Sequence, residues 1–64
     1  MINGKILEDE KTKKWGYRIW TGNPKGTQQV KILKEINNTF NSEESAKKEF
    51  QLEFNRLNNS LNFN

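Results

Sequence analysis

The chain has 64 residues, a net charge of +3 and a hydrophobic fraction of only 31%, so its folded core must be thin and has no room for a deep catalytic cavity. The sequence contains no cysteine and no histidine, which excludes disulfides, thiolate catalysis and nearly every zinc site. Its aromatic fraction of 11% is nevertheless too high for a typical disordered chain, and we therefore expect one small folded domain.

Three strands are predicted first along the chain. A short strand over Asn3 to Glu8 leads into the polar stretch DEKTKK, which can close a hairpin. Aromatic and β-branched residues are concentrated in Trp15 to Thr21, which makes the second strand the clearest of the three. The segment GNPKG then predicts a turn, and TQQVKILKEI, residues 27–36, predicts the third strand.

A helix is predicted from about Ser42 to about Asn58. Ser42 is a good N-cap, and two glutamates follow it in the first turn. Apolar residues then recur at spacings of four, four and three and form one stripe: Ala46, Phe50, Phe54 and Leu57. Residues 1–58 therefore form one domain, and residues 59–64 are expected to be a frayed polar tail or the start of a linker.

One helix can cover only one face of a three-stranded sheet. We therefore expect an α+β fold of the order β-β-β-α, with a three-stranded antiparallel sheet and the C-terminal helix packed on one face. Alternation along the strands places these residues under the helix: Ile6, Trp15, Tyr17, Ile19, Val30 and Ile32, with Phe40 at the end. It places these on the open face: Lys5, Leu7, Arg18, Trp20, Gln29, Lys31 and Leu33.

The positive charge belongs to the strand half of the chain. Residues 1–34 contain eight basic and three acidic residues, a balance of +5, whereas residues 35–64 contain three basic and five acidic residues, a balance of −2. Such a division is typical of a surface that faces a polyanion and is backed by a neutral or acidic scaffold. A solvated surface that only confers solubility is the alternative.

Three motifs follow one another along the chain: WGYRIW (residues 15–20), GNPKGTQQVKI (residues 22–32) and FNSEESAKKEF (residues 40–50). Together they resemble the AP2-like, or arm-type, N-terminal DNA-binding domain of phage and transposon tyrosine integrases. The resemblance covers about residues 2–57, although the family usually has Glu where this chain has Ser45. From the resemblance we expect either a domain of a longer integrase or a small stand-alone protein of a phage or mobile element that has borrowed the fold.

The resemblance implies that the sheet lies in the DNA major groove, where strand side chains read the sequence during DNA recombination. The implied contact residues are Lys5, Arg18, Trp20, Gln29 and Lys31. Arg and Lys can bond guanine and Gln can bond adenine, while a tryptophan can contact a thymine methyl group or the sugar-phosphate backbone. Phosphates beside the groove would be met by lysines in the loops at the ends of the sheet: Lys14 and Lys25, with Lys11 and Lys13.

A protein partner is the main alternative to DNA, because aromatic residues and arginine are also enriched in protein interfaces. In that case the open face would bind a target such as a defence nuclease or a recombinase. RNA binding is less favoured, because this face offers a single aromatic, Trp20, where stacking surfaces normally use two or more.

We expect no enzymatic activity, cofactor, metal site or small-molecule substrate. The acidic run EDE at residues 8–10 is better explained as part of a charged hairpin loop than as a metal site. No apolar run approaches the roughly 20 residues of a membrane span, and no signal-peptide pattern is present at the start of the sequence. We therefore expect a cytoplasmic protein without a membrane partner.

Overall fold

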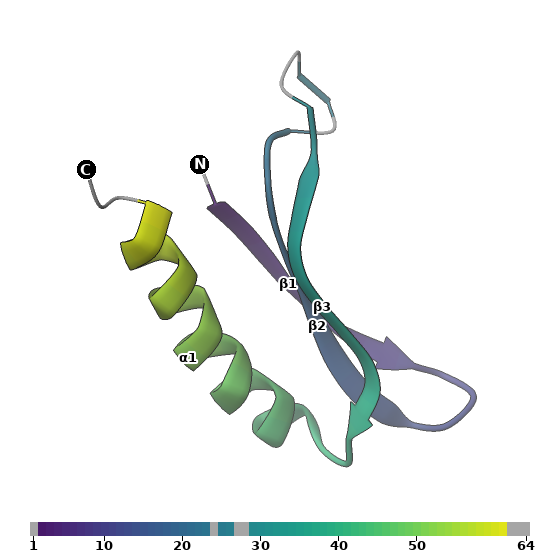
Figure 1. Ribbon diagram of the computed structural model, residues 1–64. Coiled ribbons are helices and arrows are strands. Elements are labelled where there is room, and N and C mark those ends of the chain that lie inside the picture. The colour runs from purple at the N-terminus through teal and green to yellow at the C-terminus, as the bar shows by residue number, and fades with distance from the viewer. Residues whose placement is uncertain (1, 24, 27–28, 62–64) are drawn as a thin grey trace.

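The computed structural model describes residues 2–23, 25–26 and 29–61, and their arrangement confirms the predicted α+β fold. The elements in chain order are β1 (Ile2–Asp9), β2 (Lys14–Thr21), β3 (Lys31–Phe40) and α1 (Glu43–Leu61). The strands form one antiparallel sheet in the order β1-β2-β3. Figure 1 shows that α1 lies along one face of this sheet and leaves the other face uncovered.

The ends of two elements differ from the prediction. β3 begins at Lys31, so Gln29 and Val30 precede the strand, and residues 27–28 of the predicted strand lie outside the described residues. α1 continues to Leu61, so residues 59–61 of the expected tail are helical, while residues 62–64 lie outside the described residues. Among the described residues, no helix is both long enough and apolar enough to cross a membrane.

Asp9 closes the hairpin between β1 and β2. Its carboxylate oxygen Oδ1 accepts hydrogen bonds from the backbone N–H groups of Lys11 at 2.9 Å and Thr12 at 3.4 Å. Its carbonyl oxygen accepts a third bond, at 2.7 Å, from the N–H of Lys13, which has a positive φ of 61°. This local bonding explains how a loop without an Asn-Gly pair makes the turn.

Ser42 is the N-cap of α1, as predicted. Its hydroxyl oxygen accepts a hydrogen bond from the backbone N–H of Ser45 at 3.2 Å, and its carbonyl oxygen accepts one from Ala46 at 3.2 Å. The first bond satisfies an N–H group of the first turn that has no partner within the helix, and the second is the first regular bond of the helix. The cap thus fixes where the chain leaves β3 and turns back over the sheet.

The core lies between β2 and α1. Tyr17, Ile19 and Ala46 are fully buried. The Tyr17 ring stacks on Phe40 with centroids 6.2 Å apart and meets the edge of Phe50 at 5.7 Å. Edge-to-face and offset aromatic pairs of this kind add about 0.5 to 1.5 kcal/mol beyond the area that they bury. The predicted stripe of α1 is therefore the packing face, and Leu52, which lies off the stripe, is 67% exposed.

The prediction that Val30 and Ile32 belong to the core is wrong. Val30 is 38% exposed and Ile32 is 48% exposed. The cause is a register shift: Ile19 pairs with Lys34, but the next residue, Trp20, pairs with Ile32. Leu33 is therefore an extra residue in β3, which reverses the alternation on which the prediction relied.

Candidate binding face

The face of the sheet that α1 does not cover carries a row of three charged side chains, one from each strand. Arg18 of β2 pairs directly with Lys5 of β1 on one side and with Glu35 of β3 on the other. Residues paired across an antiparallel ladder share a face, so the three side chains stand side by side. We call this surface the open face, and its centre is this Lys5-Arg18-Glu35 row.

Glu35 binds Arg18. Its Oε2 atom lies 2.7 Å from Nε and 2.5 Å from Nη2 of the guanidinium group. The two side chains are 44% and 33% exposed, so the ion pair is weak as a source of stability, although it orients the guanidinium group. Because Glu35 uses the Nε edge, the Nη1 group of Arg18 remains available to a ligand.

Trp20 borders a small hollow next to this row. The hollow has a volume of about 200 Å³ and is lined by four side chains: Arg18, Trp20, Val30 and Ile32. Trp20 pairs with Ile32 on one side and with Asn3 on the other. The Asn3 amide donates a 2.9 Å hydrogen bond to the carbonyl oxygen of Gly22, which has a φ of 92°. The end of β2 that carries Trp20 is thereby fixed to β1.

The structure brings Lys5, Arg18 and Trp20 together, as predicted. Lys14 stands on the same face at the far end of β2, opposite Asp9, because side chains at even positions of β2 alternate to this side. Leu7 also belongs to this face, where it pairs with Gly16.

The prediction that Lys31 stands beside Trp20 is wrong. Lys31 pairs with Thr21, which by alternation shares the side of the sheet that carries Ile19, and the extra residue Leu33 is again the reason. Gln29 is exposed but precedes β3, so it is not held on the open face by strand pairing. Lys25 is exposed in the turn after β2, where its N–H donates to the Asn23 side chain at 2.9 Å.

Sequence reasoning did not identify three residues of this face: Glu35, Val30 and Ile32. The signal for Glu35 was present, since it is the one acidic residue of β3. A signal for the register shift was present as well, because apolar residues at both 32 and 33 do not fit an unbroken alternation. No sequence rule locates the shift itself, which depends on how β3 pairs with β2.

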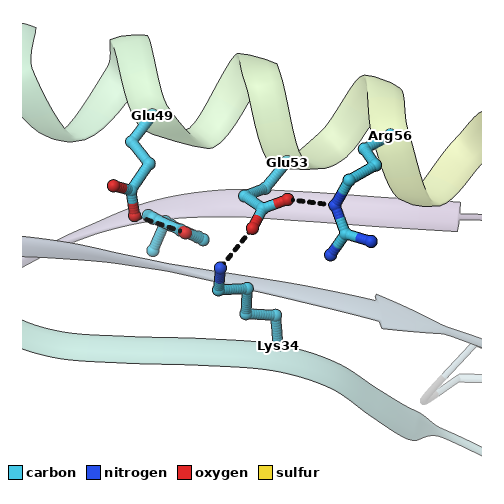
Figure 2. A network of polar contacts seen from close by, with 5 residues as sticks. Lys34, Glu49, Glu53 and Arg56 are labelled. Atoms are coloured by element: carbon cyan, nitrogen blue, oxygen red, sulfur yellow. Dashed lines mark hydrogen bonds and ion pairs between the residues drawn. The ribbon is translucent and has the colours of Figure 1, made fainter.

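A second set of polar groups joins α1 to the sheet, and its acidic and basic side chains bind one another (Figure 2). The Tyr17 hydroxyl donates to Glu49 at 2.8 Å, and Glu53 binds both Lys34 and, at 2.6 Å, Arg56. Hydrogen bonds from Arg56 and from Lys34 lower the pKa of Glu53 to about 2. Burial and the bond to Glu49 raise the pKa of Tyr17.

This network engages basic side chains that would otherwise be available to a binding partner. Lys34, although it belongs to the basic half of the chain, is engaged by Glu53 on the helix side, and the bond to Glu53 raises its pKa. Within the part of the chain that the structure describes, the ion pairs involve Arg18, Lys34 and Arg56 as the basic partners. Lys5 makes none of them, so its charge faces solvent.

No group of three or more acidic side chains that could hold a metal ion occurs among the described residues. The Asp9 carboxylate, which belongs to the acidic run EDE, accepts hydrogen bonds from loop N–H groups. Comparisons of the chain with protein-family models, curated proteins and solved structures found no match. The resemblance to integrase arm-type domains therefore stays a prediction from the sequence.

Proposed function

We propose that this chain binds double-stranded DNA in a sequence-specific manner by placing its open face in the major groove. The observation that carries the proposal is the direct pairing of Lys5 with Arg18 beside Trp20 on the face that α1 leaves uncovered. Two like charges opposite one another destabilise a sheet, and a polyanion removes that cost when it binds. Glu35 offsets only part of the cost, because it binds Arg18 and not Lys5.

The dimensions of the sheet are compatible with a groove. Two outer strands that flank a central one lie about 10 Å apart, and the major groove of B-DNA is about 12 Å wide. The open face can therefore enter the groove with α1 on the outside. Lys5 and Arg18 would then meet base edges, while Lys14 and Lys25, at opposite ends of β2, would lie near the flanking phosphates.

We further propose that this binding serves DNA recombination in a phage or mobile element, in the cytoplasm, as the resemblance to integrase arm-type domains implies. Gln29 and Lys31 have a reduced part in this version of the mechanism. Both are exposed near the turn, where the cation of Lys31 and the amide of Gln29 can contact phosphate. The residues proposed to read bases are Lys5, Arg18 and Trp20.

The test is a titration of labelled duplex DNA at several salt concentrations, read by fluorescence anisotropy. If four lysines each neutralise one phosphate, the logarithm of the binding constant should fall against the logarithm of salt concentration with a slope of roughly −3.5. A flat salt response, or no affinity for duplex at low salt, would contradict DNA binding.

Matched charge variants locate the interface. Lys5→Ala and Arg18→Ala should weaken binding, and Arg18→Ala should also relax preference at one base pair by about 1 to 3 kcal/mol. Lys48→Ala is the control, because Lys48 is an equally exposed cation on α1, away from the sheet. Equal losses for Lys5→Ala and Lys48→Ala would show that the open face is not the binding surface.

A protein partner is the second candidate, and the hollow beside Trp20 favours it. A half-buried aromatic residue with two neighbouring exposed aliphatic side chains and an arginine is the composition of an interface hot spot. In that case the chain would regulate or inhibit a protein of the host or of the element, such as a nuclease or a recombinase. A folded chain that does not bind duplex DNA at low salt would favour this candidate.

A further inference from the structure

The hollow next to Arg18 offers a surface for one apolar group. Its walls are the indole of Trp20 and the aliphatic side chains of Val30 and Ile32, which are 38% and 48% exposed. Covering such exposed aliphatic surface lowers the free energy of the system, because apolar area is removed from water. The remaining wall is Arg18, so whatever enters the hollow must also accept a cation at its side.

We infer that the hollow receives the 5-methyl group of a thymine, in a duplex whose neighbouring guanine is bound by Arg18. This inference rests on the proposed function. The thymine methyl is the apolar group that base pairs display in the major groove, and guanine O6 and N7 are the acceptors that arginine matches. Charge complementarity supports a nucleic acid here, because Arg18 lines the hollow and Lys5 pairs directly with Arg18 on the neighbouring strand.

Glu35 orients Arg18, which is one of the two contacts. Its Oε2 atom holds the Nε and Nη2 groups of Arg18 at 2.7 and 2.5 Å, so the guanidinium group cannot swing away from the hollow without breaking both contacts. The unbound edge, with Nη1, stays available for a guanine. The cation and the apolar site are therefore neighbours on one face, and Glu35 favours the orientation of Arg18 in which both can contact the same duplex.

Strand spacing limits how far apart the two bases can be. Arg18 and Trp20 are two residues apart on one face of β2, a separation of about 6.8 Å in an extended strand. Base pairs of B-DNA are stacked about 3.4 Å apart, so this distance spans two steps. The target sequence should therefore contain a thymine within about two base pairs of the guanine.

The experiment removes single methyl groups from the DNA. A tight-binding duplex is selected from a random library with the full chain, and each thymine near its guanines is then replaced by deoxyuridine, one at a time. At one position the affinity of the unaltered protein should fall about fourfold, the effect expected for one buried methyl group. Replacement elsewhere should change the affinity little.

Protein variants then assign the lost contact to the hollow. Ile32→Ala and Val30→Ala should fold, because both residues are exposed, and should bind the thymine and uracil duplexes equally well. Leu52→Ala is the control: it removes an apolar and still more exposed side chain from α1, outside the hollow, and should keep the fourfold difference.

Three results would overturn the inference, each in a recognisable way. If the duplex binds but every uracil replacement leaves its affinity unchanged, no thymine methyl is read, while DNA binding itself stands. If the fourfold difference survives in both hollow variants, the methyl group is bound elsewhere. If no duplex binds even at low salt, the proposed function fails as well, and a protein side chain becomes the occupant to test.

Discussion

The ring of Phe50 fills the space above Gly4 in which any larger residue would place its Cβ atom. The helix and β1 approach one another closely at this point, and Phe54 lies beside the same position, 3.1 Å from where that Cβ would be. Gly4, although itself exposed, therefore leaves the room that lets the helix ring pack against β1.

Gly4→Ala should destabilise the protein by about 1 to 3 kcal/mol, the usual cost of an extra group in a well-packed site. The added methyl group would overlap the Phe50 ring, which is held by Tyr17 and Phe54 and cannot move aside freely. Urea unfolding measures the change. Gly26→Ala is the control, since among the described residues its Cβ would approach Asn23 no closer than 3.4 Å, and an equal loss in both variants would contradict the explanation.

Phe50→Ala should cost about 3 to 5 kcal/mol, which is comparable to the whole stability of a domain of this size. The reason is that Phe50 contacts Tyr17 at 5.7 Å and Phe54 at 5.4 Å between ring centroids. Leu52→Ala, at a position 67% exposed, should change stability by less than about 0.5 kcal/mol. A cooperative thermal transition retained by Phe50→Ala would argue against this core.

Acid should weaken the fold through Glu53. Its pKa falls from 4.5 to about 2 in the folded protein, first because of Arg56 and then because of Lys34. The unfolded chain therefore binds the proton earlier, and the stabilising contribution is complete above pH 4.5 and is lost as the pH falls toward 2.

Circular dichroism melts from neutral pH down to pH 2 would measure this effect against Glu53→Gln. The variant should be less stable than the unaltered protein at neutral pH, and the difference should vanish near pH 2 as the Glu53 carboxylate becomes protonated. A constant difference across the whole range would mean that the ion pairs of Glu53 contribute nothing.

Glu35→Gln should raise affinity for unrelated duplex sequences and lower discrimination between sequences. The substitution removes one negative charge from the open face and loosens the hold on Arg18, while an exposed ion pair is worth only about 0 to 1 kcal/mol to the fold. Competition between a selected and a scrambled duplex measures the ratio. An unchanged ratio would show that Glu35 does not position Arg18.

The two tryptophans should report on different events. Trp15 pairs with Phe40 at the helix-facing side of the sheet, whereas Trp20 stands on the open face. In Trp15→Phe, the remaining indole should therefore change its fluorescence when duplex DNA is added. In Trp20→Phe, the fluorescence of the remaining Trp15 indole should not change when DNA is added but should change when the protein unfolds. The reverse pattern would mean that Trp15 contacts the DNA and Trp20 belongs to the core.

Much of the fold can be predicted from local sequence rules because each rule acts over a few residues. Alternation in β2 identifies Tyr17 and Ile19 as buried, and the Ser42 cap together with the stripe through Phe50 locates α1. These features depend on period, propensity and capping, which a short window of sequence contains.

The composition of the open face was less predictable for a physical reason. One extra residue at Leu33 moves Ile32 next to Trp20 and takes Lys31 away from it, and nothing in a binary pattern fixes where two strands slip past one another. The partnership of Arg18 with Glu35 follows from the same register, as does the reach of Lys34 to Glu53 across the helix interface. Contacts between distant segments therefore follow from the pairing of whole strands and not from any short window of sequence.

β2 separates two kinds of selective pressure along one strand. Changes at Tyr17 or Ile19 are filtered by folding, while Arg18 and Trp20, which alternate with them, can vary with little effect on the buried layer. A library that randomises the exposed positions 5, 18, 32 and 35, together with Trp20, should for that reason contain mostly folded members. If the open face binds DNA as proposed, single substitutions at these positions can change the bound sequence without a loss of stability.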